Sequence, residues 1–323
     1  MFLPIALLLL PLSGQTWTVA ETGPADFADL PAAIAAVAPG DTLLVEPGTY
    51  SPFVLTKTLT ILGAADGPLP EIAGTARVEG APAFTLAGLK FFALEVRDVP
   101  GRALVDDCEV GYTDDLVQGP VGADPVTGNA SFTIERCGQV LVSRLACRGE
   151  QGFSGWEELP GLEVEESTVV VIDSVIVGGR GGDNFGIDGL PGGAGVFVGP
   201  GSEVLIAGST VRGGDGGQCV LIGGSSYGGH GLVIHGTSTV VLRGSSWDVL
   251  EGGFGCGGGP DGYPAEGAGT LVVSGVTVVG FLFLDGLVQP VPPEPYLELG
   301  GGAAPGEARR VRVHGPVGAA AFV

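Results

Sequence analysis

Pairs of apolar residues recur along the middle of the chain, each pair ending two positions before a turn. Eight residues occupy equivalent turn positions, at intervals of 19 to 37 residues: Gly63, Gly88, Asp107, Arg144, Asp173, Gly208, Gly244 and Gly275. Four positions before each turn lies one apolar residue: Leu59, Phe84, Ala103, Val140, Val169, Val204, Val240 and Leu271. A second apolar residue lies two positions before each turn, and this alternation is typical of a strand with one buried face. Seven of the eight turn residues are Gly or Asp, which adopt positive φ most easily.

Two further apolar sets repeat with the same interval. One set lies three positions after the turns: Phe91, Val110, Cys147, Ile176, Val211, Trp247 and Val278. The other consists of alternating pairs on a segment upstream of the turns: Ala76 and Val78, Phe132 and Ile134, Leu162 and Val164, Val196 and Val198, and Leu232 and Ile234. Each interval therefore predicts three short strands separated by turns. Repeated three-stranded coils with aliphatic interiors are typical of a parallel β-helix, so the sequence predicts an all-β solenoid of about eight coils.

One outward-facing row of the predicted solenoid is also apolar. Three positions before six successive turns lie aliphatic residues that we call the outer stripe: Leu104, Leu141, Val170, Leu205, Val241 and Val272. An aliphatic row in water is a contact surface or an aggregation hazard. Either the long loops fold back over the outer stripe, or it mediates self-association or docking.

A short amphipathic helix is predicted before the first coil. It would run from Asp29, as N-cap, to Ala38 and end at Pro39. Its apolar face comprises Leu30, Ile34 and Val37. A solenoid must cover its open ends, so we expect this helix to plug the N-terminal end of the rod.

The same region carries a resemblance to a known superfamily. The segment Asp26–Tyr50, DFADLPAAIAAVAPGDTLLVEPGTY, followed by LTKTLTILG at Leu55–Gly63, resembles the opening of pectin-lyase-like right-handed parallel β-helix proteins. That superfamily includes pectate lyases, polygalacturonases, pectin methylesterases and many bacterial surface proteins. The close similarity covers about 40 residues, and the coil pattern extends it to Gly286. The resemblance implies a right-handed parallel β-helix and an exported, carbohydrate-rich setting, whereas function must be argued from a site.

The two ends of the chain differ from the coils. Residues 1–15 resemble a secretory signal peptide, because an apolar run from Phe2 to Leu12 precedes small residues; a buried N-terminal strand or an anchor is the alternative. We therefore expect a secreted or cell-surface protein whose β-helix domain spans residues 16–286. Residues 287–323 predict a Pro-rich linker followed by a C-terminal β cap or a partial β-module. The chain ends abruptly in apolar residues, so a truncated chain is an alternative.

Composition and charge exclude several classes of partner. The 323 residues carry 36 acidic against 14 basic side chains, a net charge of −22 that repels nucleic acids and anionic lipid surfaces. The negative charge does not exclude metal cations and cationic ligands as partners. No stretch after the signal segment reaches 18 consecutive apolar residues, so no membrane span is predicted. A hydrophobic content of 45% excludes a disordered acidic chain.

Candidate catalytic groups lie on outward positions of the upstream strands. A Ca²⁺-dependent lyase acting on an acidic polysaccharide needs oxygen ligands and an Arg or Lys that abstracts a proton. The candidates are Glu135, Glu163, Glu165 and Arg136. The alternative is a solvated sheet face, because outward positions of any solenoid are polar. Two features found in polygalacturonases, GHG at 229–231 and a pair of aspartates at 114–115, lie about three coils apart, too far to flank one glycosidic bond.

The long loops leave the predicted rod at one phase and are rich in Gly and in acidic residues. Asp183, Asp188 and Asp215 are candidate ligands for Ca²⁺, the one cofactor that the sequence suggests. Residues 178–183 fit the GGxGxD pattern of Ca²⁺-binding nonapeptide repeats, but the pattern occurs once, whereas those repeats share ions between consecutive copies. Ordinary flexible Gly-rich loops are the alternative.

Five cysteines in an exported chain leave one unpaired unless a bond is intermolecular. Cys219 and Cys256 lie at matching positions of consecutive loops, so we predict a disulfide between them. Cys108 and Cys147 point inward but are two residues out of phase, so we expect core thiols. Cys137 lies in a turn and stays unassigned.

These patterns leave two hypotheses about function. An exported β-helix with a structural, adhesive or glycan-binding role, attached to a polysaccharide or another cell-surface component, would show dispersed charges or an aromatic platform. Candidates for the platform are Trp156, Phe197 and Tyr227, although loop anchoring would also explain them. A polysaccharide lyase or glycoside hydrolase would instead show two acidic groups and an Arg within about 6 Å of one another in a cleft.

Overall fold

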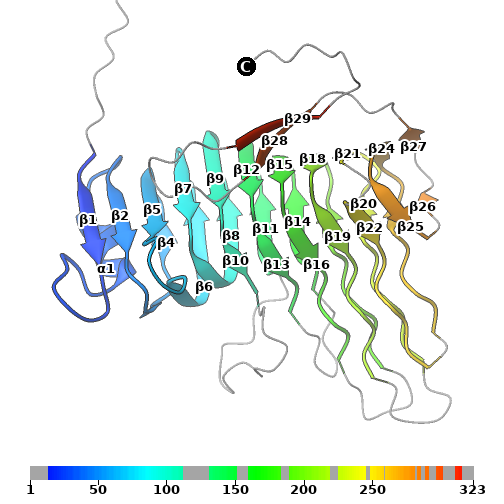
Figure 1. Cartoon of the computed structure of the whole chain (residues 1–323), viewed down its shortest axis with the longest axis horizontal. Helices are drawn as coiled ribbons and strands as arrows, with labels where there is room; N and C mark the ends of the chain where they lie inside the picture. The colour runs from blue at the N-terminus through cyan, green and yellow to red at the C-terminus, as the bar shows by residue number, and fades with distance from the viewer. Residues whose placement is uncertain are drawn as a thin grey trace, which may run out of the picture.

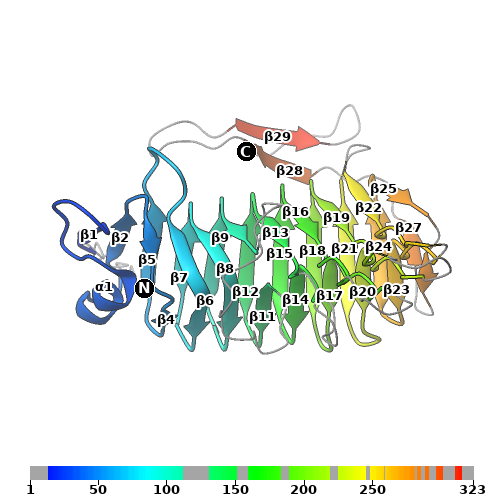
Figure 2. The same ribbon diagram turned by 90° about the horizontal axis from the view of Figure 1, so that it is seen from below.

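The chain forms a right-handed parallel β-helix, a rod of three stacks of parallel strands (Figures 1 and 2). This computed structural model describes residues 14–111, 131–150, 159–182, 189–218, 225–244, 248–257, 259–280, 282–284, 288–290, 296–300 and 310–314. The predicted fold class is confirmed. Within these residues, no helix is long and apolar enough to cross a bilayer.

The first stack is an 11-stranded parallel sheet that contains all eight predicted turn strands. Its strands are β1 (Thr16–Val19), β2 (Thr42–Val45), β5 (Leu59–Gly63), β7 (Phe84–Ala87), β9 (Arg102–Asp106), β12 (Gln139–Ser143), β15 (Thr168–Ile172), β18 (Glu203–Ala207), β21 (Thr239–Arg243), β24 (Thr270–Ser274) and β27 (Val288–Pro290). The register pairs Val140 with Val169 and Val169 with Val204, so the predicted apolar column is confirmed. Strands β1, β2 and β27 lengthen the sheet beyond the eight predicted coils.

Two long strands join the other two stacks into one sheet. They are β6 (Glu71–Glu79) and β8 (Lys90–Arg97), with β3 (Thr49–Tyr50) and β4 (Val54–Leu55) paired to β6. The upstream stack continues through β11 (Phe132–Glu135), β14 (Leu162–Glu165), β17 (Val196–Val198), β20 (Leu232–Ile234), β23 (Ala265–Gly267) and β26 (Phe283–Leu284). The stack after the turns continues through β10 (Glu109–Val110), β13 (Ala146–Arg148), β16 (Val175–Val177), β19 (Thr210–Arg212), β22 (Val249–Glu251) and β25 (Thr277–Val279).

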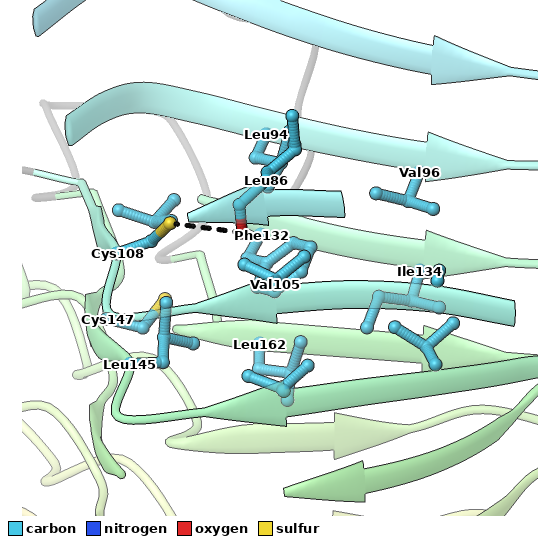
Figure 3. Close-up of a cluster of buried hydrophobic side chains, with 14 of the residues drawn as sticks. Leu86, Leu94, Val96, Val105, Cys108, Phe132, Ile134, Leu145, Cys147 and Leu162 are labelled. Atoms are coloured by element: carbon cyan, nitrogen blue, oxygen red, sulfur yellow. Dashed lines mark hydrogen bonds between the residues drawn. The ribbon is translucent and has the colours of Figure 1, made fainter. Parts of the chain in front are cut away.

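Inward side chains from all three stacks form one core. Figure 3 shows part of it, where Phe132 lies between its register partners Leu94 and Leu162, all fully buried. Cys108 and Cys147 lie in the same cluster, which confirms them as core thiols. Burial raises the pKa of Cys108 to about 12 and raises the pKa of Cys147 as well, so both thiols stay protonated at neutral pH.

One predicted core position is wrong. The sequence pattern assigned Trp247 to the column after the turns, but Leu250 pairs with Val211 and Val278 in that column. Leu250 is buried, whereas Trp247 lies outside the described residues. The connection after Gly244 is therefore three residues longer than in the preceding coils.

The predicted capping helix is α1 (Leu30–Ala36). The Asp29 carboxylate accepts a hydrogen bond from the Leu30 amide at 2.8 Å, as an N-cap does. The helix ends two residues earlier than predicted, because Val37 is already extended. Its buried residues Leu30, Ala33 and Ile34 join the core, together with Val37 at the C-cap, so the helix closes the rod at the N-terminal end.

Buried serines line two corners of the rod and satisfy backbone groups there. At one corner the Ser167 hydroxyl accepts from the Cys137 amide at 2.9 Å and donates to the Glu165 carbonyl at 2.6 Å. At the other corner the Ser174 amide donates to the Ser209 hydroxyl at 3.1 Å. Each serine thus links one coil to the next where the chain bends out of the strand ladder.

The C-terminal region adds a separate pair of strands. The segment predicted as a linker begins with β27, which pairs with β24 and so belongs to the rod. Strands β28 (Tyr296–Gly300) and β29 (Arg310–His314) form a two-stranded antiparallel sheet. Both strands lie in the segment predicted as a β cap or a partial β-module, and residues 301–309 and 315–323 lie outside the described residues.

Candidate ligand-binding surface

The Gly-rich loops form an ordered two-layer array, which we call the glycine blade. Its outgoing segments are 178–182, 213–217 and 252–256, and its returning segments are 189–194, 226–230 and 259–263. Figure 1 shows these green-to-yellow chains running side by side below β16, β19 and β22. Within the described residues, these segments are paired by a regular pattern of backbone hydrogen bonds.

Backbone hydrogen bonds hold the two layers of the glycine blade together. The Gly193 amide donates to the Gly179 carbonyl at 2.8 Å, and the Gly214 amide donates to the Gly193 carbonyl at 2.8 Å. The zigzag continues through Gly229 and Gly253, whose amides donate across the layers at 2.7 and 2.8 Å. Outgoing and returning segments therefore alternate along one continuous ladder.

Several positions of the glycine blade require glycine because there is no room for a Cβ atom. A Cβ built on Gly253 would overlap the Gly214 carbonyl oxygen, and a Cβ on Gly214 would overlap the Gly179 carbonyl oxygen. Neither residue has positive φ, so backbone conformation alone does not require glycine there. Neighbouring outgoing segments approach so closely at these positions that no side chain fits between them.

Every third residue of the glycine blade points outward. Hydrogen bonds to the neighbouring outgoing segment recur at Gly178 and Gly181, three residues apart, which is the period of a polyproline II chain. The residue after each glycine pair therefore lies on an outer face. These residues are Arg180, Asp215 and Phe254 on the outgoing layer, and Ala194 and His230 on the returning layer. Tyr263, preceded by Asp261 and Gly262, occupies the corresponding position of the last returning segment.

Aromatic residues gather on the returning layer, whose outer surface we call the return face. Tyr227 is 56% exposed and Tyr263 is 39% exposed. Tyr227 lies three residues before His230, so the three-residue period places both on the same face. The rings of His230 and Tyr263 stack with their centroids 5.5 Å apart and their planes 4° from parallel. The return face thus carries the stack of His230 on Tyr263 and, three residues before His230, the exposed ring of Tyr227.

Hydrogen bonds fix the orientation and protonation of His230. Its Nδ1 accepts from the Tyr263 amide at 3.0 Å, and its Nε2 contacts the Glu266 carboxylate. Burial lowers the pKa of His230, while the negative charge of Glu266 raises it. Because Nδ1 is occupied as an acceptor, we assign the neutral tautomer with the proton on Nε2, and the net shift of the pKa is downward.

The return face continues from the glycine blade onto the strands of the rod. Returning segments lead directly into β17, β20 and β23, so Phe197 follows Ala194 by three residues and Glu266 follows Tyr263 by three. Along the rod, register places Phe197 between Glu163 and Val233. Phe197 is partly exposed there. Two candidates for an aromatic platform, Phe197 and Tyr227, therefore belong to one continuous surface.

The acidic catalytic candidates lie next to this surface, but Glu135 and Arg136 are engaged in ion pairs. Glu135 contacts Arg136 and lies 3.3 Å from Arg97 Nε. Arg136 also binds Asp98, with Nε 2.7 Å from Oδ1. Both Arg136 and Asp98 adopt positive φ at the bend between the stacks, so this pair also links successive coils.

Glu163 and Glu165 lie one coil further along, on β14. Glu165 is the register partner of Glu135 and is partly exposed. Glu163 is the register partner of Thr133 and then of Phe197. The structure thus brings three of the four catalytic candidates onto adjacent outward positions, at the N-terminal side of the aromatic residues.

The opposite face of the glycine blade carries Asp215, a Ca²⁺ candidate. Its carboxylate binds Arg212 at 2.7 Å and accepts from the Phe254 amide at 2.9 Å. Arg212 also lies over the Phe254 ring, 5.0 Å from its centroid. Asp215 therefore contributes to the packing of this face. Among the described residues, no cluster of three or more His, Cys, Asp or Glu side chains could hold a metal ion.

Several predicted site residues lie outside the described residues. They are Asp183, Asp188, Trp156 and Cys219. The Ca²⁺ site and the Cys219–Cys256 disulfide therefore stay predictions. Cys256 itself is partly exposed at the far end of the glycine blade, where its amide donates to the Ser226 carbonyl at 3.0 Å.

Sequence reasoning missed two members of the return face, His230 and Tyr263. His230 was considered only as part of a polygalacturonase-like motif, and Tyr263 not at all. For His230 the available signal was the recurrence of Gly-Gly-x triplets, because x falls on an outer face; Tyr263 follows Asp261 and Gly262 and so lacks this signal.

Comparisons with known proteins add little to this geometry. No known protein family matches the chain, and no curated protein is similar to it. Among solved structures, the ORF18 protein of Geobacillus virus E2 is 11% identical with a TM-score of 0.34, over 84% of this chain and 56% of that one. The chain therefore spans little more than half the length of that protein.

Two further solved structures are similar at the same level. A pectin methylesterase mutant in complex with a hexasaccharide is 10% identical with a TM-score of 0.29, over 93% of this chain and 85% of that one. A rhamnogalacturonan lyase is 10% identical with a TM-score of 0.22, over 83% and 84%. Similarities this weak carry no inference about function.

Proposed function

We propose that this protein is secreted or held at the cell surface and binds a glycan through the return face. The observation that carries the proposal is the His230–Tyr263 ring stack with Tyr227 exposed beside it. Flat aromatic surfaces with polar edges suit sugar rings, which present an apolar C–H face and hydroxyls around it. Exposed aromatic clusters on a soluble protein mark binding sites more often than chance exposure.

The rigidity of the glycine blade supports this role. The aromatic residues stand on segments tied to both neighbours and to the opposite layer by backbone hydrogen bonds. A platform that is already ordered loses less entropy on binding than a flexible loop. The successive coils present these groups along the rod axis, which fits an extended polymer.

The charge around the return face defines the glycan further. Glu163, Glu165 and Glu266 border the aromatic residues, and the whole chain carries a net charge of −22. Polyuronates would be repelled by these carboxylates. We therefore assign a neutral or amino-bearing glycan to this surface. The same charge disfavours the alternative function, a lyase acting on an acidic polysaccharide, in which Arg136 would have to abstract a proton while paired with Asp98 and Glu135.

Binding to a panel of polysaccharides tests the proposal. The purified protein is incubated with insoluble neutral, amino-bearing and acidic polymers, and the bound fraction is measured at several concentrations. We expect Tyr227→Ala and Tyr263→Ala each to weaken binding at least about fivefold, given the contribution of a buried aromatic ring. Phe254→Ala is the matched control, because Phe254 is 59% exposed on the opposite face of the glycine blade.

Two outcomes would overturn the proposal. One is the absence of binding to every polymer; the other is equal loss of binding in the Phe254→Ala control. The same incubations with polygalacturonate and alginate, with and without Ca²⁺, followed for unsaturated products, test the lyase alternative directly.

A further inference from the structure

The outer stripe is an aligned, partly exposed row on the first sheet. Register places its six members directly above one another from β9 to β24: Leu104, Leu141, Val170, Leu205, Val241 and Val272. All six side chains are partly exposed. The expectation that loops cover and bury the outer stripe is therefore not met.

The row extends by two more coils at its N-terminal side. Thr85 on β7 pairs with Leu104, and Thr60 on β5 pairs with Thr85. Eight coils at about 4.8 Å and three outward columns about 6.6 Å apart cover roughly 38 by 20 Å. That is about 760 Å² on one copy, close to the roughly 800 Å² that each partner contributes to a stable interface.

The column beside the outer stripe carries two charges of opposite sign. Its members from β9 to β24 are Arg102, Gln139, Thr168, Glu203, Thr239 and Thr270. Arg102 and Glu203 are both exposed, and neither forms an ion pair within the part of the chain that the structure describes. They lie three coils apart along the rod.

We propose that the outer stripe binds a second copy of this chain, packed face to face and antiparallel along the rod. A two-fold axis that runs along the strands, between β12 and β15, exchanges β9 with β18 and β12 with β15. It sets Leu104 against Leu205 and Leu141 against Val170 of the second copy. The same axis sets Arg102 of each copy against Glu203 of the other, forming two identical ion pairs, as an isologous interface requires.

The positions of Arg102 and Glu203 favour this arrangement over two other ways of packing the two copies. Moving the axis by one coil, to lie between β15 and β18, sets Arg102 against Thr270 and leaves both charges without a partner. A parallel arrangement sets Arg102 against Asp106, whose carboxylate already binds Arg144 and Ser143. The axis between β12 and β15 also overlaps all eight coils from Thr60 to Val272.

Charge reversal tests the interface without disturbing the core. Sedimentation of the full chain at several concentrations measures the monomer–dimer equilibrium. We expect a dimer for the natural sequence, and a dissociation constant at least about tenfold higher for R102E and for E203R alone, because like charges then face each other twice. An equimolar mixture of R102E and E203R should form a heterodimer as stable as the natural dimer, because opposite charges then face each other at both positions.

A second variant keeps the test independent of the charges. L141D places a carboxylate at the centre of the outer stripe and should give a monomer, with an unchanged melting temperature at low concentration. A natural chain that stays monomeric at millimolar concentration would overturn the proposal. So would a dimer that L141D leaves intact, or a mixture of R102E and E203R that does not associate. None of these results depends on glycan binding.

Discussion

The rod and the glycine blade belong to the same coils, yet opposite features of the chain hold them together. In the rod, successive coils contact through aliphatic side chains such as Leu86 and Val171, which are fully buried. In the glycine blade, the segments contact through the backbone, and a Cβ on Gly214 or Gly253 would overlap a carbonyl oxygen of the neighbouring outgoing segment. Removing atoms should therefore destabilise the rod, and adding atoms should destabilise the glycine blade.

The largest effect is expected from one added methyl group in the glycine blade. Gly253→Ala forces its segment away from the neighbouring outgoing segment at Gly214, which strains the ladder of backbone hydrogen bonds around it. We expect a loss of about 3–5 kcal/mol in the free energy of unfolding, measured by urea titration. Gly236→Ala is the control, because an added Cβ there lies 3.6 Å from its nearest neighbour, the Ala268 Cβ. Similar losses in both variants would contradict the spatial role of Gly253.

The opposite substitution should damage the rod. Leu86→Ala removes a fully buried side chain from the core and leaves a cavity. We expect a loss of about 2–4 kcal/mol, measured by the same titration. Thr85→Ala, at the adjacent outward position, should change stability by less than about 0.5 kcal/mol. If Leu86→Ala were neutral, side-chain burial would not be what stabilises the rod.

A smaller effect should come from the corners, where the rod also depends on polar contacts. Ser167→Ala deprives the Cys137 amide of its hydroxyl acceptor. Because that amide is buried, we expect a loss of about 1–2 kcal/mol. The exposed Ser51→Ala serves as the control. Equal melting temperatures for the two variants would show that the serine corners do not stabilise the coils.

The smallest effect concerns pH and should arise on the glycine blade. Because the pKa of His230 is lowered by burial, the unfolded chain takes up this proton first as the pH falls. The stability contributed by neutral His230 is complete above the unfolded pKa of about 6.5 and is lost below it. We therefore expect His230→Gln to flatten the fall in melting temperature below pH 6.5, with His235→Gln as the control. Identical pH profiles for His230→Gln and the natural chain would refute this assignment.

The rod could be predicted from the sequence because the apolar side chains of its core recur at regular intervals. Alternating apolar residues such as Val169 and Val171 report a buried strand face, and register confirms their columns. The prediction failed at Trp247, because a fixed offset from the turn assumes equal connections in every coil. Leu250 occupies the column there since the preceding connection is longer.

The glycine blade was missed because its segments contact one another mostly through backbone atoms. Periods of 2 and 3.6 residues reveal strands and helices, whereas the pairs Gly178-Gly179 and Gly181-Gly182 repeat on a three-residue period. A Gly-rich segment also resembles a flexible linker in composition, although here the absence of Cβ atoms permits close backbone packing. Consequently Tyr227 was found as an isolated aromatic residue, and the stack of His230 on Tyr263 was not.

Hydrogen–deuterium exchange of the glycine blade amides tests most directly whether backbone packing orders this region. The informative amides belong to Gly193, Gly214, Gly229 and Gly253, each of which donates across the layers. We predict protection of the peptides that contain them for hours at neutral pH, comparable with that of peptides from β15 and β18. Complete exchange within seconds, while the rod stays protected, would show that these segments are flexible loops and would contradict the account.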